Sequence, residues 1–195
     1  FLYGFAMTSL VVTRDPPPWE SHPWFFEIYA ALLDDPAAAR AEIAARMAAA
    51  NDDPTHAGLA LFLAGMLADV AGDESLVRRA DWQITLVAQA LGREMAAGNN
   101  GYSDTWRVAL WAGALRLANH VLRRGDLTRL LAPVKNHVYA RHTGGGTLMS
   151  SSDRVTLGFD TLLAAVPFGL FDAEDLVVVD AAGQLSARAD ASADE

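Results

Sequence analysis

The chain has 195 residues, of which 52% are hydrophobic and 20% are charged, and its formal net charge is −9. This composition is typical of an ordered globular protein and excludes disorder over most of the length. The 15 Lys and Arg residues are spread along an acidic chain, which argues against nucleic acid and favours a neutral ligand. Because the chain has no cysteine, disulfides and thiolate metal sites are excluded.

The hydropathy and the two ends of the chain predict its cellular location and its domain boundaries. No run of 18 consecutive apolar residues and no signal-peptide pattern is present, so we expect a soluble, cytoplasmic protein that contacts no membrane. The chain starts within the apolar run Phe1-Leu2-Tyr3-Gly4-Phe5, which favours a fragment of a longer protein. We predict a helical-hairpin domain over residues 1–184 and a disordered tail over residues 185–195, where little can be buried.

Apolar residues recur at spacings of three and four along nearly the whole chain, which predicts an all-α fold of about eight helices. A first apolar segment ends near residue 12, before three prolines at 16–18 that cannot lie inside a helix. Aspartate followed by proline, at Asp35-Pro36 and again at Asp53-Pro54, is a helix-start signal. The first half therefore predicts helices over residues 24–33, 36–50 and 54–71.

The second half continues with longer helices. Gly72-Asp73 ends one helix and caps the next, which we predict over residues 74–97 with Leu76, Val77, Trp82, Ile84, Val87, Leu91 and Met95 facing inward. Further helices are predicted over residues 105–124 and 127–142, followed by a flexible triple glycine at 144–146. A helix over residues 155–166 then ends at Pro167, and a short one begins near residue 173.

The rhythm of helix, short turn and helix indicates antiparallel hairpins in a bundle, a solenoid or an α/α toroid. No sequence repeat of fixed period is present, which disfavours the solenoid.

The loop over residues 98–107 (GNNGYSDTWR) carries the strongest functional signal. Glycine and asparagine supply the turn, and the following helix fixes the direction of Asp104. Tyr102 and Trp106 flank this carboxylate. Rings that stack on sugar C–H faces, next to a proton donor for the glycosidic oxygen, are typical of a carbohydrate site.

Several features occur in an order that resembles a known family. They are the turn Ala71-Gly72-Asp73, a Trp-bearing helix, the loop GYSDTW at residues 101–106, and the stretch GFDTLLAAVPFGLF at residues 158–171. From Thr55 to about Asp180, this layout is similar to the glucoamylase-like glycoside hydrolases of family 15. The resemblance covers about two thirds of the chain and implies a toroid of six helical hairpins that hydrolyses α-linked glucosides with inversion.

The chain also departs from that family. The family has its general acid, a Glu, directly after the loop Trp, and Arg107 stands there in this chain. Toroidal glycosidases of the trehalase and processing-glucosidase kind use a Gly-x-Asp-x-x-x-x-Trp loop, and this resemblance gives the acid role to Asp104. A six-hairpin toroid needs about twelve helices, so the family's base would lie beyond Glu195 and the chain by itself would be catalytically incomplete.

Each candidate residue also has a structural alternative. Asp104 would need a raised pKa to act as an acid, whereas capping the helix that follows would lower its pKa. Asp160 is expected among apolar residues of a helix, where its charge needs either a ligand or a cation from Arg107, Arg116 or Arg154. Arg107 could bind a sugar hydroxyl or pair with an acid across the hairpin.

Of the tryptophans, Trp19 and Trp106 lie beside loops and are expected to bind substrate, while Trp111 is expected in the core. We predict neither a metal nor a cofactor, because His137 and His142 stand five residues apart with no further ligand near them in the sequence.

The sequence thus predicts a glycoside hydrolase with a small carbohydrate substrate. One alternative is a non-catalytic helical scaffold or interaction domain, and another is an epimerase or lyase in which His56 or His142 lines the cleft. The oligomeric state stays open.

Overall fold

The computed structural model describes residues 22–96, 105–144, 147–148, 168–172, 174–175, 178–179 and 183. For residues 105, 106 and 139–148, it describes the backbone and not the side chains. Over these ranges the chain is helical apart from one short hairpin, so the predicted all-α class is confirmed. In chain order, the helices are α3 (Trp24–Asp34), α4 (Pro36–Ala48), α5 (Pro54–Ala71), the 3-10 turn η1 (Val77–Arg79), α6 (Asp81–Ala96), α7 (Thr105–Leu122), α8 (Gly125–Leu131) and α9 (Val134–His142).

The helix-start signals in the first half act as predicted. The side chains of Asp35 and Asp53 accept hydrogen bonds from backbone amides in the first turns of α4 and α5. A proline follows each cap, at a position where its missing N–H is not needed. At the other end of α5, Gly72 takes the left-handed conformation (φ 70°) that ends a helix at little steric cost.

The helix predicted over residues 74–97 is wrong at its start. The chain first forms η1, and α6 begins only at Asp81. Trp82, predicted to face inward, is 46% exposed, whereas Ile84 and Val87 of the same helix are buried. Trp82 precedes Ile84 by two residues, which is about 200° around the helix axis, so the two side chains lie on opposite faces of α6.

The helix predicted over residues 127–142 is two helices, α8 and α9, that meet at Pro133. Proline has no N–H for the helical ladder, and its ring clashes with the preceding turn, which explains the division. The turn before α8 contains Arg123 (φ 53°), while Gly125, which lies between the two predicted helices, is the first residue of α8.

Gly144, the first residue of the triple glycine predicted to be a flexible link, lies in a strand of a short β-hairpin, and Gly145 and Gly146 lie outside the described residues. Strand β1 (Thr143–Gly144) pairs antiparallel with β2 (Thr147–Leu148), with Thr143 opposite Leu148 and Gly144 opposite Thr147. Two residues, both glycine, join the strands.

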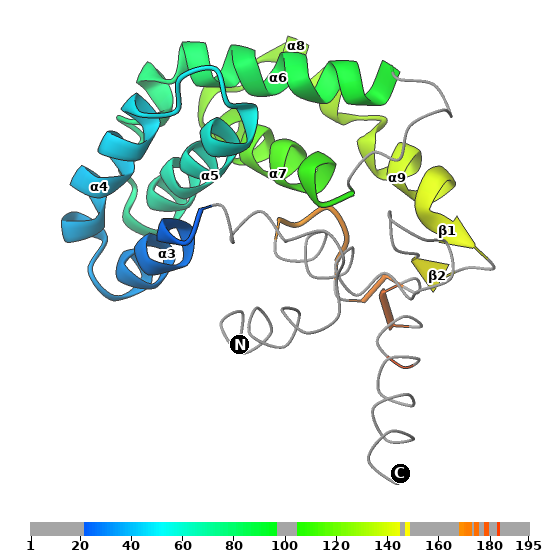
Figure 1. Cartoon of the computed structure of the whole chain (residues 1–195), viewed down its shortest axis with the longest axis horizontal. Helices are drawn as coiled ribbons and strands as arrows, with labels where there is room; N and C mark the ends of the chain where they lie inside the picture. The colour runs from blue at the N-terminus through cyan, green and yellow to red at the C-terminus, as the bar shows by residue number, and fades with distance from the viewer. Residues whose placement is uncertain are drawn as a thin grey trace, which may run out of the picture.

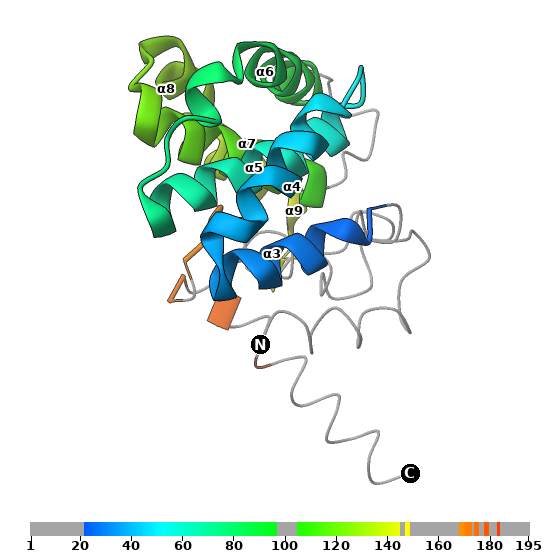
Figure 2. The ribbon, with the colours of Figure 1, turned by 90° about the vertical axis from the view of Figure 1, so that its left-hand side faces the viewer.

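The helices form two layers, and successive helices alternate between them (Figures 1 and 2). In one layer α5 contacts α3 and α7, and α7 contacts α9. On the other side α4 packs on α5, α6 packs on both α5 and α7, and α8 packs on α7. The contact between α5 and α7 is the most extensive of all, which makes this pair the centre of the core.

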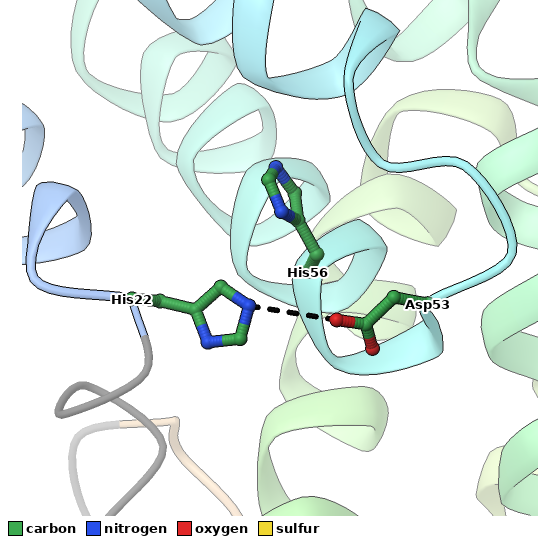
Figure 3. Close-up of side chains that lie close together, drawn as sticks. All are labelled: His22, Asp53 and His56. Carbon is green, nitrogen blue, oxygen red and sulfur yellow. Dashed lines mark ion pairs between the residues drawn. The ribbon is translucent and has the colours of Figure 1, made fainter.

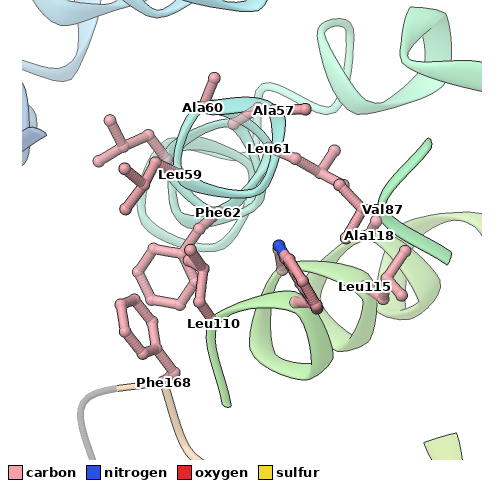
Figure 4. Close-up of a cluster of buried hydrophobic side chains, with 14 of the residues drawn as sticks. Ala57, Leu59, Ala60, Leu61, Phe62, Val87, Leu110, Leu115, Ala118 and Phe168 are labelled. Carbon is pink, nitrogen blue, oxygen red and sulfur yellow. The ribbon is translucent and has the colours of Figure 1, made fainter. Parts of the chain in front are cut away.

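Helices α5 and α7 run parallel and touch closely at two glycines. A Cβ atom built on Gly58 would lie 2.9 Å from Trp111, and one built on Gly65 would lie 2.5 Å from Leu117. The contact points therefore advance in the same direction along both helices. The Trp111 indole donates a hydrogen bond to the Pro54 carbonyl (3.0 Å) and is 5% exposed, which confirms its predicted place in the core. Figure 4 shows buried apolar side chains of both helices, among them Leu59, Leu61, Leu110 and Leu115.

Helix α5 is also, within the described ranges, the one helix long and apolar enough to cross a membrane. Its 18 residues have a mean hydropathy of 1.3, and 56% of them are buried inside the protein. Helices α3, α4, α6 and α7 all contact it. A central core helix has this composition too, so its apolarity follows from its position in the fold.

The segment at residues 168–171 packs back onto the helices. The Phe168 ring lies 5.0 Å from the Phe62 ring and 6.3 Å from the Phe25 ring, measured between centroids. The Arg116 guanidinium donates hydrogen bonds to the carbonyls of Phe168 and Gly169. Arg116, a predicted partner of Asp160, thus fixes a turn, and Asp160 itself lies outside the described residues.

Asp73 links α4 to the turn after α5, and this link predicts a pH-dependent stability. Asp73 accepts hydrogen bonds from Ser75 and from Arg40 (Nε to Oδ2, 2.7 Å), and these bonds lower its pKa to about 2. Because the folded-state pKa lies below the unfolded one, the stabilisation is full above about pH 5 and is lost as the pH falls towards 2. We expect Asp73→Asn to lower the free energy of unfolding by about 1 kcal/mol at pH 7.

Urea unfolding at pH 7 and at pH 3 checks this expectation, since the gap between wild type and Asp73→Asn should shrink at the lower pH. The control is Glu42→Gln, which removes the exposed ion pair of Glu42 with Arg46 within α4. We expect Glu42→Gln to lower the free energy of unfolding by less than about 0.5 kcal/mol. Equal losses in both variants, or a gap that is the same at both pH values, would contradict the assignment.

Candidate functional site

Three polar side chains meet where α3 and α5 begin (Figure 3). His22 lies just before α3, Asp53 is the N-cap of α5, and His56 lies in the first turn of α5. One ligand atom of each residue lies within 4.8 Å of the other two. The Pro54 signal that starts α5 therefore also sets Asp53 and His56 side by side at the end of the helix.

Asp53 serves two neighbours with its two oxygens. Oδ1 accepts a hydrogen bond from the Thr55 amide (2.8 Å), which fixes the carboxylate at the start of α5. Oδ2 lies 3.5 Å from Nε2 of His22. The Asp53 side chain is half exposed, whereas that of His22 is only 12% exposed. The pair thus lies at the rim of the core, where solvent reaches the carboxylate and not the ring.

The His56 ring is held by a backbone group. Its Nε2 lies 3.0 Å from the carbonyl oxygen of Arg46, a residue in the last turn of α4. Burial lowers the pKa of His56, and the nearby His22 lowers it further. A neutral ring that donates from Nε2 to a carbonyl has an unprotonated Nδ1. Figure 3 shows a ring nitrogen of His56 on the side of His22 and Asp53.

Trp24 forms an apolar wall beside the two imidazoles. Its ring centroid lies 4.8 Å from that of His56 and 5.9 Å from that of His22. The Arg46 guanidinium lies over the same indole, 5.1 Å from its centroid, and pairs with Glu42 (2.9 Å). The wall keeps water from one side of the cluster, which strengthens electrostatic interactions there.

The structure locates only part of the predicted sugar site. Tyr102, Asp104, Asp160 and Trp19 lie outside the described residues. The backbone of Trp106 lies in the first turn of α7, and Arg107, next to it, is exposed. Their predicted roles stay predictions.

The His22, Asp53 and His56 cluster was missed by the sequence analysis, which looked for histidines at metal-ligand spacing. Asp53 and His56 are three residues apart at a helix start, and this spacing puts them on one face. That local signal was available. His22 stands 31 positions before Asp53 in the sequence, and only the packing of α3 on α5 brings it near. The alternative in which His56 lines a functional cleft is the interpretation closest to this arrangement.

Comparisons of the chain with models of protein families, with curated proteins and with solved structures found no match.

Proposed function

We propose that this chain is part of an α/α-toroid glycoside hydrolase that inverts α-linked glucosides or oligosaccharides. The observation that supports the proposal is the parallel pair α5 and α7 in one layer, with α6 returning antiparallel in the other. A toroid of hairpins repeats this unit, with inner helices parallel to one another and outer helices between them. The fold alone does not define the chemistry, so the proposal also depends on the residues of the loop before α7.

The start of α7 lies at the same end of the layer as the start of α5. Gly58, four residues after Pro54, lies opposite Trp111, six residues after Thr105. The first residues of the two helices are thus level to within about one helical turn. Asp104 immediately precedes Thr105, the first residue of α7, in the sequence.

In this proposal Asp104 is the general acid, and Asp160 is a second, supporting carboxylate. Tyr102, Trp106 and Trp19 stack on sugar rings, and Arg107 binds a hydroxyl. Inversion needs two carboxyl groups roughly 6.5–9.5 Å apart with a water between them. The resemblance assigns no base within residues 1–195. The net charge of −9 is consistent with a neutral substrate.

A non-catalytic helical scaffold is the second candidate, and one observation favours it. Asp35 and Asp53 each directly precede the first residue of a helix, and both cap that helix. Asp104 has the same position before α7. A capping carboxylate accepts backbone N–H bonds, which lowers its pKa and opposes a role as an acid.

The substitution Asp104→Asn separates the two candidates, because asparagine caps a helix about as well as aspartate and cannot donate the catalytic proton. In the protein expressed from its full reading frame, we expect turnover of maltooligosaccharides to fall by about 100-fold or more. The melting temperature should stay within a few degrees. The control is Asp35→Asn, which changes the equivalent cap of α4 and should leave turnover unchanged.

Absence of α-glucoside turnover in the wild type would reject the hydrolase and favour the scaffold. Full turnover in Asp104→Asn would reject Asp104 as the general acid.

A further inference from the structure

We propose that His22, Asp53 and His56 form a binding site for a divalent transition-metal ion, with zinc as the ion that fits the donors best. Two imidazoles and one carboxylate are a ligand set that zinc takes in proteins, and imidazole disfavours magnesium and calcium. This inference is independent of the proposed hydrolase, since it depends on other residues and has a different measurement.

The distances suit one small ion. Ligands about 2.0–2.2 Å from a tetrahedral zinc lie roughly 3.3–3.6 Å from one another. Nε2 of His22 and Oδ2 of Asp53 are already 3.5 Å apart. The three ligand atoms lie within 4.8 Å, so side-chain adjustments of about 1 Å, within ordinary rotamer freedom, close the set around an ion.

The protonation pattern also suits a metal. The Arg46 carbonyl accepts a hydrogen bond from Nε2 of His56, which leaves the lone pair of Nδ1 to coordinate a metal ion. Metal-bound histidines commonly have this arrangement, in which a backbone carbonyl orients the ring through its other nitrogen. The Thr55 amide holds Oδ1 of Asp53 in the same way and leaves Oδ2 for the ion.

An ion pair between His22 and Asp53 explains only two of the three residues. His56 has no role in that pair, and its ring lies 5.3 Å from the His22 ring, where two protonated imidazoles would repel each other. A metal ion uses both rings as neutral ligands and neutralises the carboxylate. Arg46, a cation whose charge acts on His56, is paired with Glu42, which offsets its repulsion of an ion.

Access is from the carboxylate side. The Asp53 side chain is half exposed, while Trp24 and the buried His22 close the other side. Three protein ligands leave at least one coordination position of a tetrahedral ion for water.

Isothermal titration of zinc chloride into the metal-free chain tests the site. We expect one zinc per chain, and no heat of binding with magnesium chloride. Asp53→Asn keeps the cap and removes the charge, and His56→Gln removes one ring; each should weaken zinc binding about 10-fold or more. The matched controls are Asp35→Asn, a cap on α4, and His120→Gln, an exposed histidine on α7, and both should bind zinc like the wild type.

Cobalt(II) provides a second measurement on the wild type alone. A four-coordinate cobalt ion in this site would give intense visible absorption bands, which octahedral cobalt in buffer lacks. No zinc binding by the wild type, or equal weakening by the controls, would overturn the proposal. Loss of glycoside turnover in Asp104→Asn with zinc binding intact would uphold both proposals, and zinc binding without any turnover would reject only the hydrolase.

Discussion

Gly65→Ala is expected to lower the free energy of unfolding by about 2 kcal/mol. The added Cβ would lie 2.5 Å from the Cβ of Leu117, an atom fixed to the backbone of α7. The two helices must therefore move apart over their most extensive contact. Alanine stabilises a helix by up to about 1 kcal/mol relative to glycine. The destabilisation from overpacking is larger than this gain.

Gly92→Ala is the matched control for this substitution. Gly92 lies inside α6, and nothing lies within 4 Å of a Cβ built there. The same change should therefore stabilise the protein by about 0.5–1 kcal/mol through helix propensity. Urea unfolding of both variants measures the difference. If both changes stabilise the protein, α5 and α7 do not approach each other as closely as described.

The helix starts that the sequence predicts well are those with a complete local signal. At Asp35 and Asp53, a capping side chain and a following proline act within four residues, so no knowledge of the rest of the fold is needed. At residues 74–81 the signal misleads. Gly72-Asp73 is a good stop and cap, but Asp73 pairs with Ser75 and Arg40, and the helix proper begins only at Asp81.

The packing of parallel helices is harder to predict from the sequence. Gly58 and Gly65 stand seven residues apart in a helix that is apolar all round, where a periodic stripe has no preferred face. Only the structure shows that these two positions face α7. The same holds for the candidate metal site, because His22 becomes a neighbour of His56 through tertiary packing.

The predicted carbohydrate site is a different case, because its argument is local. A loop with an acid between two rings can be found in one sequence. Whether these side chains converge with Asp160 depends on contacts between segments more than 50 positions apart, which chain-local patterns do not contain.

Phe168→Ala is expected to lower the free energy of unfolding by about 3 kcal/mol or more, the largest effect we predict. The Phe168 ring is 4% exposed and packs edge-on against Phe62 of α5, with Phe25 of α3 beside it. Truncation leaves a cavity between these rings in addition to the lost burial. It should also release the turn at Gly169, where the Arg116 guanidinium donates hydrogen bonds to the carbonyls of Phe168 and Gly169.

Leu33→Ala is the control for the truncation of Phe168, since Leu33 is 56% exposed on α3 and should cost less than about 0.5 kcal/mol. Thermal and urea unfolding of the two variants measure the contrast. Intrinsic tryptophan fluorescence adds a local measurement, because Trp111 lies in α7 near Gly113, on whose backbone Phe168 packs. If Phe168→Ala costs as little as Leu33→Ala, the Phe168 ring does not pack against Phe62 and Phe25 as described.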